Sequence, residues 1–443
     1  MEERAPSWGI EPVPERLRVL GFADLGLLWG NLSVSLLVIV AGALLVPGLS
    51  LPTALVAILV GALLGNLMLG AAGMIGADAR VPAMVLLRAP LGRRGSYAPT
   101  ALNVAQGFGW SIFELLIIAT AAGALSDELF GFEARWLWTI VFGGVAVALA
   151  LLGPIGFVRR YVRRFALWVV LASLVYLTWW VLDRSDLGDF WSAEGRGGFP
   201  SFWHGVDLVI ASVVSWTPLA ADYTRFARSR RAAFWGTGLG YLVPTVWMFG
   251  LGAFLLLARD IDDAAAIPAA VVAGGALSVL ALLALTVDET DEAFANVYST
   301  AVSLQNVLPR VPQRLLIVLV AAIATVGALV IDLGNYTTFL YLLGSCFVPL
   351  FGVLLADWLV RGAHYSRDDV FASPAVRPGQ LGAWIAGFAL YQWLAPVGPS
   401  WWTDLLSHTN PAPIDFTASI PSFAAAFALS ALASRYRSPR TAG

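Results

Sequence analysis

The stretch Ala211–Arg231, ASVVSWTPLAADYTRFARSRR, decides the fold because it is an apolar segment that interrupts its own helix. Pro218 has no N–H, so the carbonyl of Val214 loses its intrahelical partner. In a bilayer such a carbonyl is tolerated only where protein or a water-lined cavity satisfies it. Trp216 lies beside this break. The pattern is typical of a broken helix in a transporter site. The alternative is a kinked structural helix that touches no ligand, because proline is common in membrane helices.

The composition indicates a polytopic membrane protein. Of 443 residues, 58% are hydrophobic and only 13% are charged, which is far more apolar surface than a soluble protein of this size needs. The net charge of −2 does not suggest a nucleic-acid partner. Cys346 is the single cysteine, so no internal disulfide is possible. The three histidines are far apart and show no metal-ligand spacing.

Twelve apolar spans are predicted, at 24–46, 53–76, 98–125, 136–153, 165–182, 203–221, 233–257, 275–303, 314–331, 335–358, 380–395 and 416–434. An even number of spans puts both termini on one side. All but four of the 27 arginines then fall in segments on that side, the exceptions being Arg135, Arg184, Arg196 and Arg259. The arginine distribution therefore predicts cytoplasmic N- and C-termini. The expected location is the cytoplasmic membrane of a bacterium.

The first span is interrupted as well, by the polar run WGNLSVS, which contains Gly30, Asn31 and Ser33. Spans one and six thus carry breaks at corresponding places in two groups of five spans. Such pairs are the best sequence indication of an inverted-repeat transporter with a site at the membrane midplane. The alternative is that these polar residues only bond to neighbouring helices.

The predicted organisation follows from these spans. It comprises a cytoplasmic N-terminal segment (1–23), a first five-helix repeat (24–182), a second five-helix repeat (203–358), two further helices (380–434) and a cytoplasmic tail (435–443).

The third span carries a polar stripe. Gln106, Trp110 and Glu114 recur every four residues, so they share one helix face, which Asn103 joins. A carboxylate and amides in lipid face a bundle interior or a cavity. An indole offers a flat face to a planar ring, and an amide can bond the ring edge. An ordinary polar packing seam is the alternative.

The eighth span contains the run VDETDE, which places four carboxylates within five residues. Asp288, Glu292 and Asn296 share one helix face. Carboxylate, hydroxyl and carbonyl oxygens suit Na⁺, and a carboxylate can instead carry a proton. Residues 268–287 are long enough to cross the membrane alone, which would place the acidic run at the inner water interface.

Four pieces of the chain resemble the nucleobase–cation symporter family one, which comprises the purine/cytosine permeases and their hydroxymethylpyrimidine-transporter relatives. They are GNLSVS, VPAMVLLRAPLGRRGSYAPTALNVAQGFGW, VSWTPLAADYTRFAR and DEAFANVYS. The resemblance covers most of spans one to ten, and the second and third pieces are long and specific. It implies an all-α, leucine-transporter-like fold of two inverted five-helix repeats with two extra C-terminal helices.

The resemblance also implies roles for matching residues. Trp110 resembles the tryptophan that stacks on the substrate ring, Gln106 its amide neighbour, and Trp216 the aromatic residue on the opposite face. Asn296 resembles the amide that pairs with the substrate. Asn31 is predicted to be a further substrate-binding residue.

The cation site that the resemblance implies combines span-one carbonyls with span-eight oxygens. The matching positions are Gly30, Ser33, Val34, Val287, Thr290 and Asp291. Asp291 departs from the family, where relatives have a hydroxyl, so the coupling ion is open between Na⁺ and H⁺. Na⁺ is favoured, because unwound carbonyls need a cation.

We therefore expect a secondary transporter that imports a small planar heterocycle with Na⁺. The alternative is H⁺-coupled transport of a hydantoin-like ring, a thiamine-precursor pyrimidine or an amino acid. A channel or sensor is disfavoured because no loop is long enough for an output domain. An enzyme is not expected, because neither HExxH nor a serine elbow occurs. The expected partners are the substrate and the lipid bilayer, with no obligate protein partner and no cofactor beyond the coupling ion.

Overall fold

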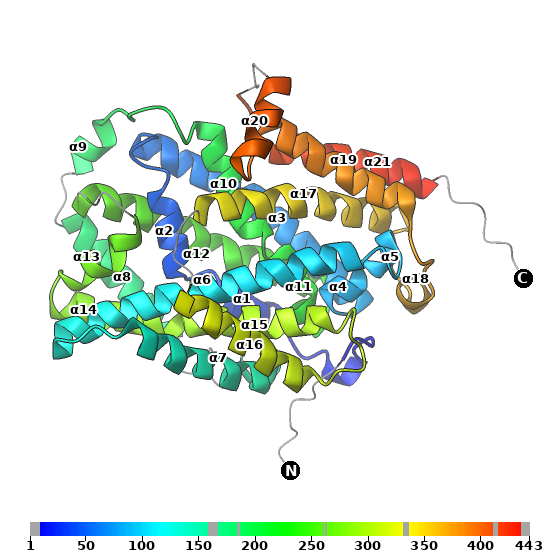
Figure 1. Ribbon diagram of the computed structural model, residues 1–443, viewed down its shortest axis with the longest axis horizontal. Helices are drawn as coiled ribbons and strands as arrows, with labels where there is room; N and C mark the ends of the chain where they lie inside the picture. The colour runs from blue at the N-terminus through cyan, green and yellow to red at the C-terminus, as the bar shows by residue number, and fades with distance from the viewer. Residues whose placement is uncertain are drawn as a thin grey trace, which may run out of the picture.

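The computed structural model describes residues 9–157, 167–183, 187–259, 261, 264–330, 336–410 and 415–435, with backbone only at 153–157, 167, 187, 265 and 291. Apart from one isolated parallel bridge between Leu20 and Ala227, the regular structure of these residues is helical. Most of the long helices lie roughly along one axis, as Figure 1 shows. This arrangement fits the predicted all-α membrane protein.

The helices follow one another with few long connections. In chain order they are α1 (Phe22–Asn31), α2 (Leu36–Ala43), α3 (Leu51–Ala79), α4 (Ala83–Leu86), α5 (Arg88–Leu91), α6 (Tyr97–Phe130), α7 (Arg135–Phe157), α8 (Leu167–Asp183), α9 (Leu187–Ser192), α10 (Phe202–Val214), α11 (Thr217–Thr224), α12 (Arg230–Arg259), α13 (Ile267–Val272), α14 (Ala276–Asp288), α15 (Thr290–Leu304), α16 (Gln313–Val330), α17 (Tyr336–Val360), α18 (Arg367–Phe371), α19 (Pro378–Leu394), α20 (Ser400–Thr409) and α21 (Ser419–Arg435). Single 3₁₀ turns lie at Glu15–Leu17 and Ala264–Ala266.

Local sequence explains where the central helix α3 begins and ends. Ser50 precedes it, and its hydroxyl accepts the N–H of Thr53, while Pro52 occupies the first turn, where a missing N–H costs nothing. Arg80 closes the helix in a left-handed conformation, with φ at 63°. The helix has 29 residues, or roughly 44 Å at about 1.5 Å per residue, which is longer than a bilayer core of about 30 Å.

Among the described residues, seven uninterrupted or slightly bent helices are long and apolar enough to cross a membrane. They are α3, α6, α7, α10 with α11, α12, α16 and α17. The pair α1 and α2 meets the same criterion together but is bent by 62°. Helices α8, α14, α15, α19 and α21 are shorter, so the count of twelve spans stays a prediction.

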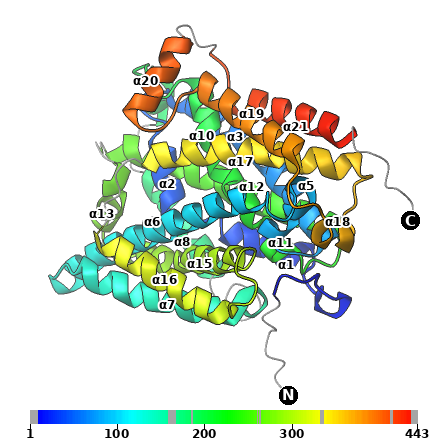
Figure 2. The same cartoon turned by 45° about the vertical axis from the view of Figure 1, so that its right-hand side comes forward.

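Two groups of helices pack together, and α17 lies against α10 and α3 of the first group (Figures 1 and 2). In the first group, α3 packs against α10, α11 and α12, and α12 also packs against α1 and α2. In the second, α6, α7, α15 and α16 pack against one another. The last two long helices, α19 and α21, cover α17. Because Gly42 has no side chain, α2 can lie directly against the backbone of α12 at Phe249, where any side chain would collide.

Buried carboxylates anchor the two ends of the bundle. At one end Asp78 on α3 accepts the indole N–H of Trp358 and the backbone N–H of Tyr365, both at 2.9 Å, and forms an ion pair with Arg230. At the other end Asp207 on α10 accepts the N–H of Ala418 at 2.7 Å, at the start of α21. Hydrogen-bonded and paired carboxylates can be buried at acceptable cost, so these contacts fix helices that lie far apart in sequence.

The described part of the N-terminal segment lies across the ends of α3 and α11. The N–H of Val13 donates to the Arg80 carbonyl at 2.9 Å, and Leu20 forms the parallel bridge to Ala227. The fully buried Arg225 donates to the carbonyl of Gly9 at 2.8 Å. This end is the one that the arginine distribution predicts to be cytoplasmic.

Candidate functional site

The predicted break in the sixth span lies between α10 and α11. The first helix ends at Val214 and the second begins at Thr217, with Pro218 in its first turn. The carbonyl of Val214, which loses its partner to the proline, accepts the Thr217 hydroxyl at 2.8 Å. The helix therefore repairs its own break locally, and the axis stays continuous enough for α10 and α11 to form one span.

The second carbonyl at this break is satisfied by another helix. Gln106 on α6 donates its side-chain N–H to the carbonyl of Ser215 at 2.7 Å. This contact fixes the Gln106 amide beside Trp216, which lies between α10 and α11. Two residues that the sequence assigned to the substrate site are thus neighbours in the structure.

The break in the first span is joined to the eighth span by carboxylates. Asn31, at the end of α1, donates to Asp288 at 3.1 Å. Ser35 and the backbone N–H of Leu36, at the start of α2, donate to the two oxygens of Glu289 at 2.7 and 2.8 Å. Glu289 itself separates α14 from α15. Its carboxylate therefore caps the N-terminus of α2, where negative charge is favoured.

The residues predicted for the cation site lie at these two breaks, but several bond elsewhere. The hydroxyl of Ser33 donates to the Tyr241 carbonyl on α12 at 2.9 Å, and Gly30 packs against the backbone of the same helix. On the eighth span, the Thr290 hydroxyl donates to the Val287 carbonyl at 2.7 Å.

Two predicted cation-site residues remain. Val34 lies in the span-one break and is buried, with its N–H bonded to the carbonyl of Asn31 at 3.0 Å. The side chain of Asp291 lies outside the described part of the structure, so its predicted role stays a prediction.

The polar stripe on α6 faces the interior, as its spacing predicts. Gln106, Trp110 and Glu114 are all buried. A side chain at Gly107 would collide with Thr300, so the glycine lets α6 lie close against α15. The helix therefore presents an amide, an indole and a carboxylate in succession to α15 and α17.

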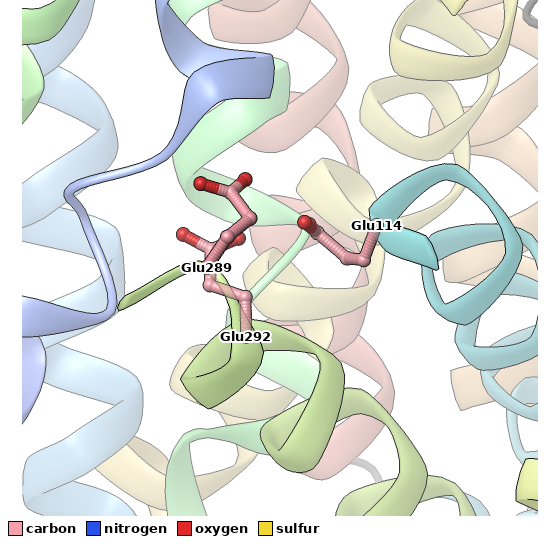
Figure 3. Close-up of side chains that lie close together, drawn as sticks. All are labelled: Glu114, Glu289 and Glu292. Atoms are coloured by element: carbon pink, nitrogen blue, oxygen red, sulfur yellow. The ribbon is translucent and has the colours of Figure 1, made fainter. Parts of the chain in front are cut away.

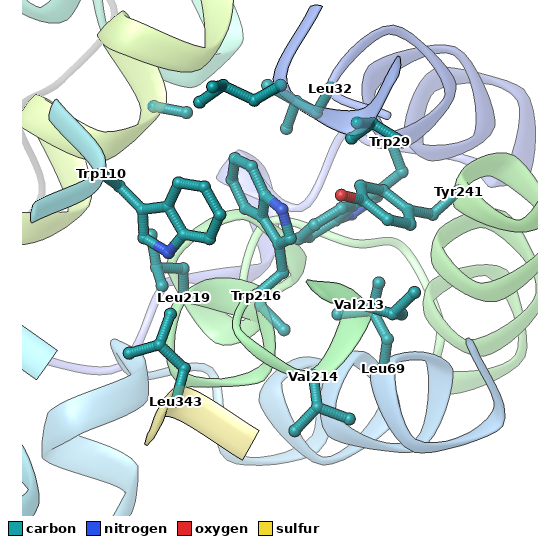
Figure 4. Packing of buried hydrophobic residues seen from close by; sticks show 14 of the residues in the cluster. Trp29, Leu32, Leu69, Trp110, Val213, Val214, Trp216, Leu219, Tyr241 and Leu343 are labelled. Carbon is teal, nitrogen blue, oxygen red and sulfur yellow. The ribbon is translucent and has the colours of Figure 1, made fainter. Parts of the chain in front are cut away.

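Two aromatic groups flank the place where α6 meets the α10–α11 break. Trp110 contacts Tyr336 and Phe339 of α17 edge-on, with ring centroids 6.0 and 5.2 Å apart. Trp216 contacts Trp29 of α1 and Tyr241 of α12, at 5.9 and 6.1 Å. Figure 4 shows the indoles of Trp110 and Trp216 next to each other. Both are almost entirely buried, at 8% and 6% exposure, so the structure is closed around them.

Three glutamates meet beside these aromatic groups. Glu114 of α6, Glu289 of the α14–α15 break and Glu292 of α15 are buried, and one carboxylate oxygen of each lies within 4.8 Å of the others (Figure 3). The described carboxylates of the acidic run, Asp288, Glu289 and Glu292, are therefore buried inside the protein. The register of the eighth span relative to the membrane stays a prediction. The sequence indicated each glutamate separately but did not predict that Glu114 joins the other two.

Two amide atoms in this region have no hydrogen-bond partner among the described residues. They are the side-chain oxygen of Gln106 and the side-chain nitrogen of Asn296, on residues only 2% exposed. Buried polar atoms are nearly always paired, so unpaired ones in a site of this kind are candidates for contact with a ligand.

The comparisons with known proteins give the family. The family model described as "Permease for cytosine/purines, uracil, thiamine, allantoin" matches residues 12–402. The chain belongs to this permease family. Its members are transporters, and the chain is accordingly an integral membrane protein of a transporter family.

Curated relatives match this permease over most of their length. The hydantoin permease of Microbacterium maritypicum is 27% identical over 394 residues, covering 83% of this chain and 79% of the relative. The cytosine permease of Escherichia coli K12 is 25% identical over 399 residues, covering 88% and 89%. The allantoin permease of Bacillus subtilis is 27% identical over 383 residues, covering 75% and 74%.

Solved structures confirm the predicted fold class. Mhp1, a nucleobase-cation-symport-1 family transporter in a closed conformation with bromovinylhydantoin bound, matches with a TM-score of 0.80. It is 20% identical, and the match covers 98% of this permease and 96% of that chain. The inward-facing conformation of Mhp1 matches with a TM-score of 0.74, at 20% identity and with 97% and 95% coverage. The permease therefore has the leucine-transporter-like fold.

Proposed function

We propose that this permease imports a small planar nitrogen heterocycle together with a cation. The observation that carries the proposal is the pair of buried indoles, Trp110 and Trp216, beside the unpaired amide atoms of Gln106 and Asn296. Flat apolar faces next to a few fixed polar atoms suit a planar ring with a polar edge. In this proposal the indoles stack on the ring, the amides bond its edge, and Asn31 holds the span-one break beside it.

Closure around the site fits a transporter that opens to each side in turn. A cavity of about 750 Å³ lies on the predicted outer side, where Leu44 of the first span meets Leu208 of α10 and Tyr341 of α17. We propose that this cavity is the outer vestibule and that the buried indoles separate it from the inside. Binding of substrate and cation together then favours movement of one helix group against the other.

The coupling cation in this proposal is Na⁺, held near the two breaks by Gly30, Ser33, Val34, Val287, Thr290 and Asp291. The bonds from Asn31 to Asp288 and from Ser35 to Glu289 support this place, because they already join span one to span eight. An ion bound there would act on both breaks at once. A monovalent cation moving inward gains about 2.3 kcal/mol per 100 mV of membrane potential.

Substrate binding by purified protein tests the first part of the proposal. A thermal-shift panel of heterocycles should show stabilisation by at least one, since a ligand at about one hundred times its Kd adds about 2.7 kcal/mol. Trp110→Ala should abolish that shift. Trp136→Ala is the matched control, because Trp136 lies on α7 and is 61% exposed. Equal shifts in both variants would remove Trp110 from the site.

Sodium dependence tests the second part. At fixed pH and ionic strength, added Na⁺ should raise substrate affinity in the wild type, and Asp291→Asn should need far more Na⁺ for the same effect. A proton-coupled protein would instead ignore Na⁺, and its Asp291→Asn variant would exchange substrate without concentrating it. Wild-type binding that is independent of Na⁺ contradicts the choice of ion.

A further inference from the structure

Two stretches that reach the end of the bundle predicted to be cytoplasmic carry arginines but no acidic residue. They are residues 81–102, which lead from α3 into the first turns of α6, and residues 297–330, which run from α15 through α16. Their arginines are Arg88, Arg93, Arg94, Arg310 and Arg314. Figure 1 shows α5, the start of α6 and the connection from α15 to α16 at one end of the molecule. Positive charge is thus concentrated there without an acidic residue on either stretch.

The side chain of Asn306 joins the two stretches. The Nε–H of Arg88 donates to its side-chain oxygen at 2.7 Å, and the Arg88 guanidinium also donates to its backbone carbonyl at 2.9 Å. The Asn306 amide donates in turn to the hydroxyls of Ser96 and Thr100 at the start of α6, at 3.0 and 2.7 Å. Helices α6, α15 and α16 also pack against one another. Arg88 is therefore committed to holding these elements together, and the other four arginines lie on neighbouring elements.

These four residues form the inner arginine cluster, which consists of the exposed Arg93, Arg94, Arg310 and Arg314. None of them forms an ion pair with any residue that the structure describes. Several other arginines at this end are neutralised. Their ion pairs are Arg80–Glu15, Arg230–Asp78, Arg361–Asp357 and Arg367–Glu11. Even Glu11, which acts on Arg88, is thus paired with another arginine. The inner arginine cluster therefore presents positive charge that its described surroundings do not neutralise.

Exposed apolar side chains continue from these arginines along the helices. On α16, which is long and apolar enough to cross a membrane, Leu315 and Leu319 follow Arg314 on one face and are 50% and 47% exposed. At the start of α6, Tyr97 and Leu102 are each 40% exposed. A cationic end above an apolar helix face is complementary to an anionic phospholipid, whose phosphate lies above its acyl chains.

We propose that the inner arginine cluster binds the headgroup of an anionic phospholipid of the inner leaflet, with an acyl chain along the exposed face of α16. Guanidinium groups bind phosphate oxygens through paired, charge-assisted hydrogen bonds. A zwitterionic phospholipid offers a phosphate too, but its ammonium group would be placed among arginines. The site therefore selects lipids with a net negative charge, and the bound lipid bridges the inner ends of α6 and α16.

Phosphatidylglycerol and phosphatidylcholine with the same acyl chains are the matched probes, because they differ in headgroup charge. Native mass spectrometry of the purified full chain in detergent measures the affinity of the first bound lipid at fixed ionic strength. Wild-type protein should bind phosphatidylglycerol at least about tenfold more tightly, since each arginine near an anionic headgroup contributes about fivefold.

Two double variants locate the site. Arg94→Gln combined with Arg314→Gln takes one arginine from each stretch and should weaken phosphatidylglycerol binding by about tenfold or more, with phosphatidylcholine binding unchanged. The control combines Arg228→Gln with Arg231→Gln, which removes two exposed arginines beside the start of α12 and should leave the preference for phosphatidylglycerol unchanged.

Three results would overturn the proposal. Equal affinity of the wild type for both lipids removes the headgroup site. An equal loss in the control variant shows that the preference comes from the total charge of this end instead of the inner arginine cluster. Displacement of phosphatidylglycerol by glycerol phosphate at the same concentration shows a site for soluble anions instead of a lipid. If the first double variant elutes as aggregate in size-exclusion chromatography, Arg93→Gln combined with Arg310→Gln replaces it, because this pair also takes one arginine from each stretch.

Discussion

Glu289→Gln tests the contact that joins the first and eighth spans. In the wild type the two side-chain oxygens of Glu289 accept one donor each, the Ser35 hydroxyl at 2.7 Å and the Leu36 N–H at 2.8 Å. Glutamine keeps the shape and can still accept the Leu36 N–H, but it replaces the charged acceptor of both hydrogen bonds with a neutral amide. Ser35 and Leu36 are both buried, so water cannot make up for the weaker bonds.

The magnitude follows from exchanging two hydrogen bonds to a charged group, worth about 1.5–3 kcal/mol each, for neutral ones worth about 0.5–1.5 kcal/mol each, which is a loss of about 1–3 kcal/mol in all. The loss should be local, because α2 starts at Leu36 and its first turn has only this carboxylate and the Ser35 side chain as caps among its described contacts. A drop of about 1–3 kcal/mol in the opening free energy corresponds to amide exchange that is roughly 5- to 150-fold faster.

Hydrogen-exchange mass spectrometry of the detergent-solubilised protein measures this effect on peptides that cover residues 32–40. Glu128→Gln serves as the control, because Glu128 is exposed near the end of α6. Peptides from α21 should exchange at the wild-type rate in both variants. Unchanged exchange at the start of α2 in Glu289→Gln would refute the view that Glu289 holds the span-one break.

Two other predictions concern packing and anchoring. Gly107→Val should destabilise the fold by about 1–3 kcal/mol through its collision with Thr300, whereas Gly144→Val, where a side chain meets open space, should not; thermal unfolding compares them. Asp207→Ala removes the acceptor for three groups at the start of α21, including the N–H of Ser419 at 3.2 Å, and should make that helix accessible to protease while the other long helices stay protected.

The breaks could be predicted from the sequence because they arise from local chemistry. A proline removes one N–H at a known offset, so the freed carbonyl at Val214 follows from the sequence alone. The identity of its new partner, the Thr217 hydroxyl, is also a local contact. Likewise, the stripe on α6 follows from helical periodicity, and burial of Gln106, Trp110 and Glu114 agrees with it.

Contacts between helices could not be predicted in the same way. Periodicity shows which residues of one helix share a face but not which face of another helix lies opposite. Glu114 therefore remained separate from the acidic run, although the structure places it within 4.8 Å of Glu289 and Glu292. The edge-on contact of Trp110 with Phe339 depends in the same way on how α17 is rotated.

The position of Glu289 links the two parts of the proposed mechanism. Its carboxylate caps α2, and the same carboxylate belongs to the triad with Glu114 and Glu292. A ligand or cation that changes the charge of the triad therefore changes the cap on α2 as well, because one side chain serves both. The other end of α2, at Ala43, adjoins Leu44, which lines the proposed outer vestibule. Under the proposed function, we expect occupancy of the site to act on the outer end through these contacts, because coupled transport requires that the two sites influence each other.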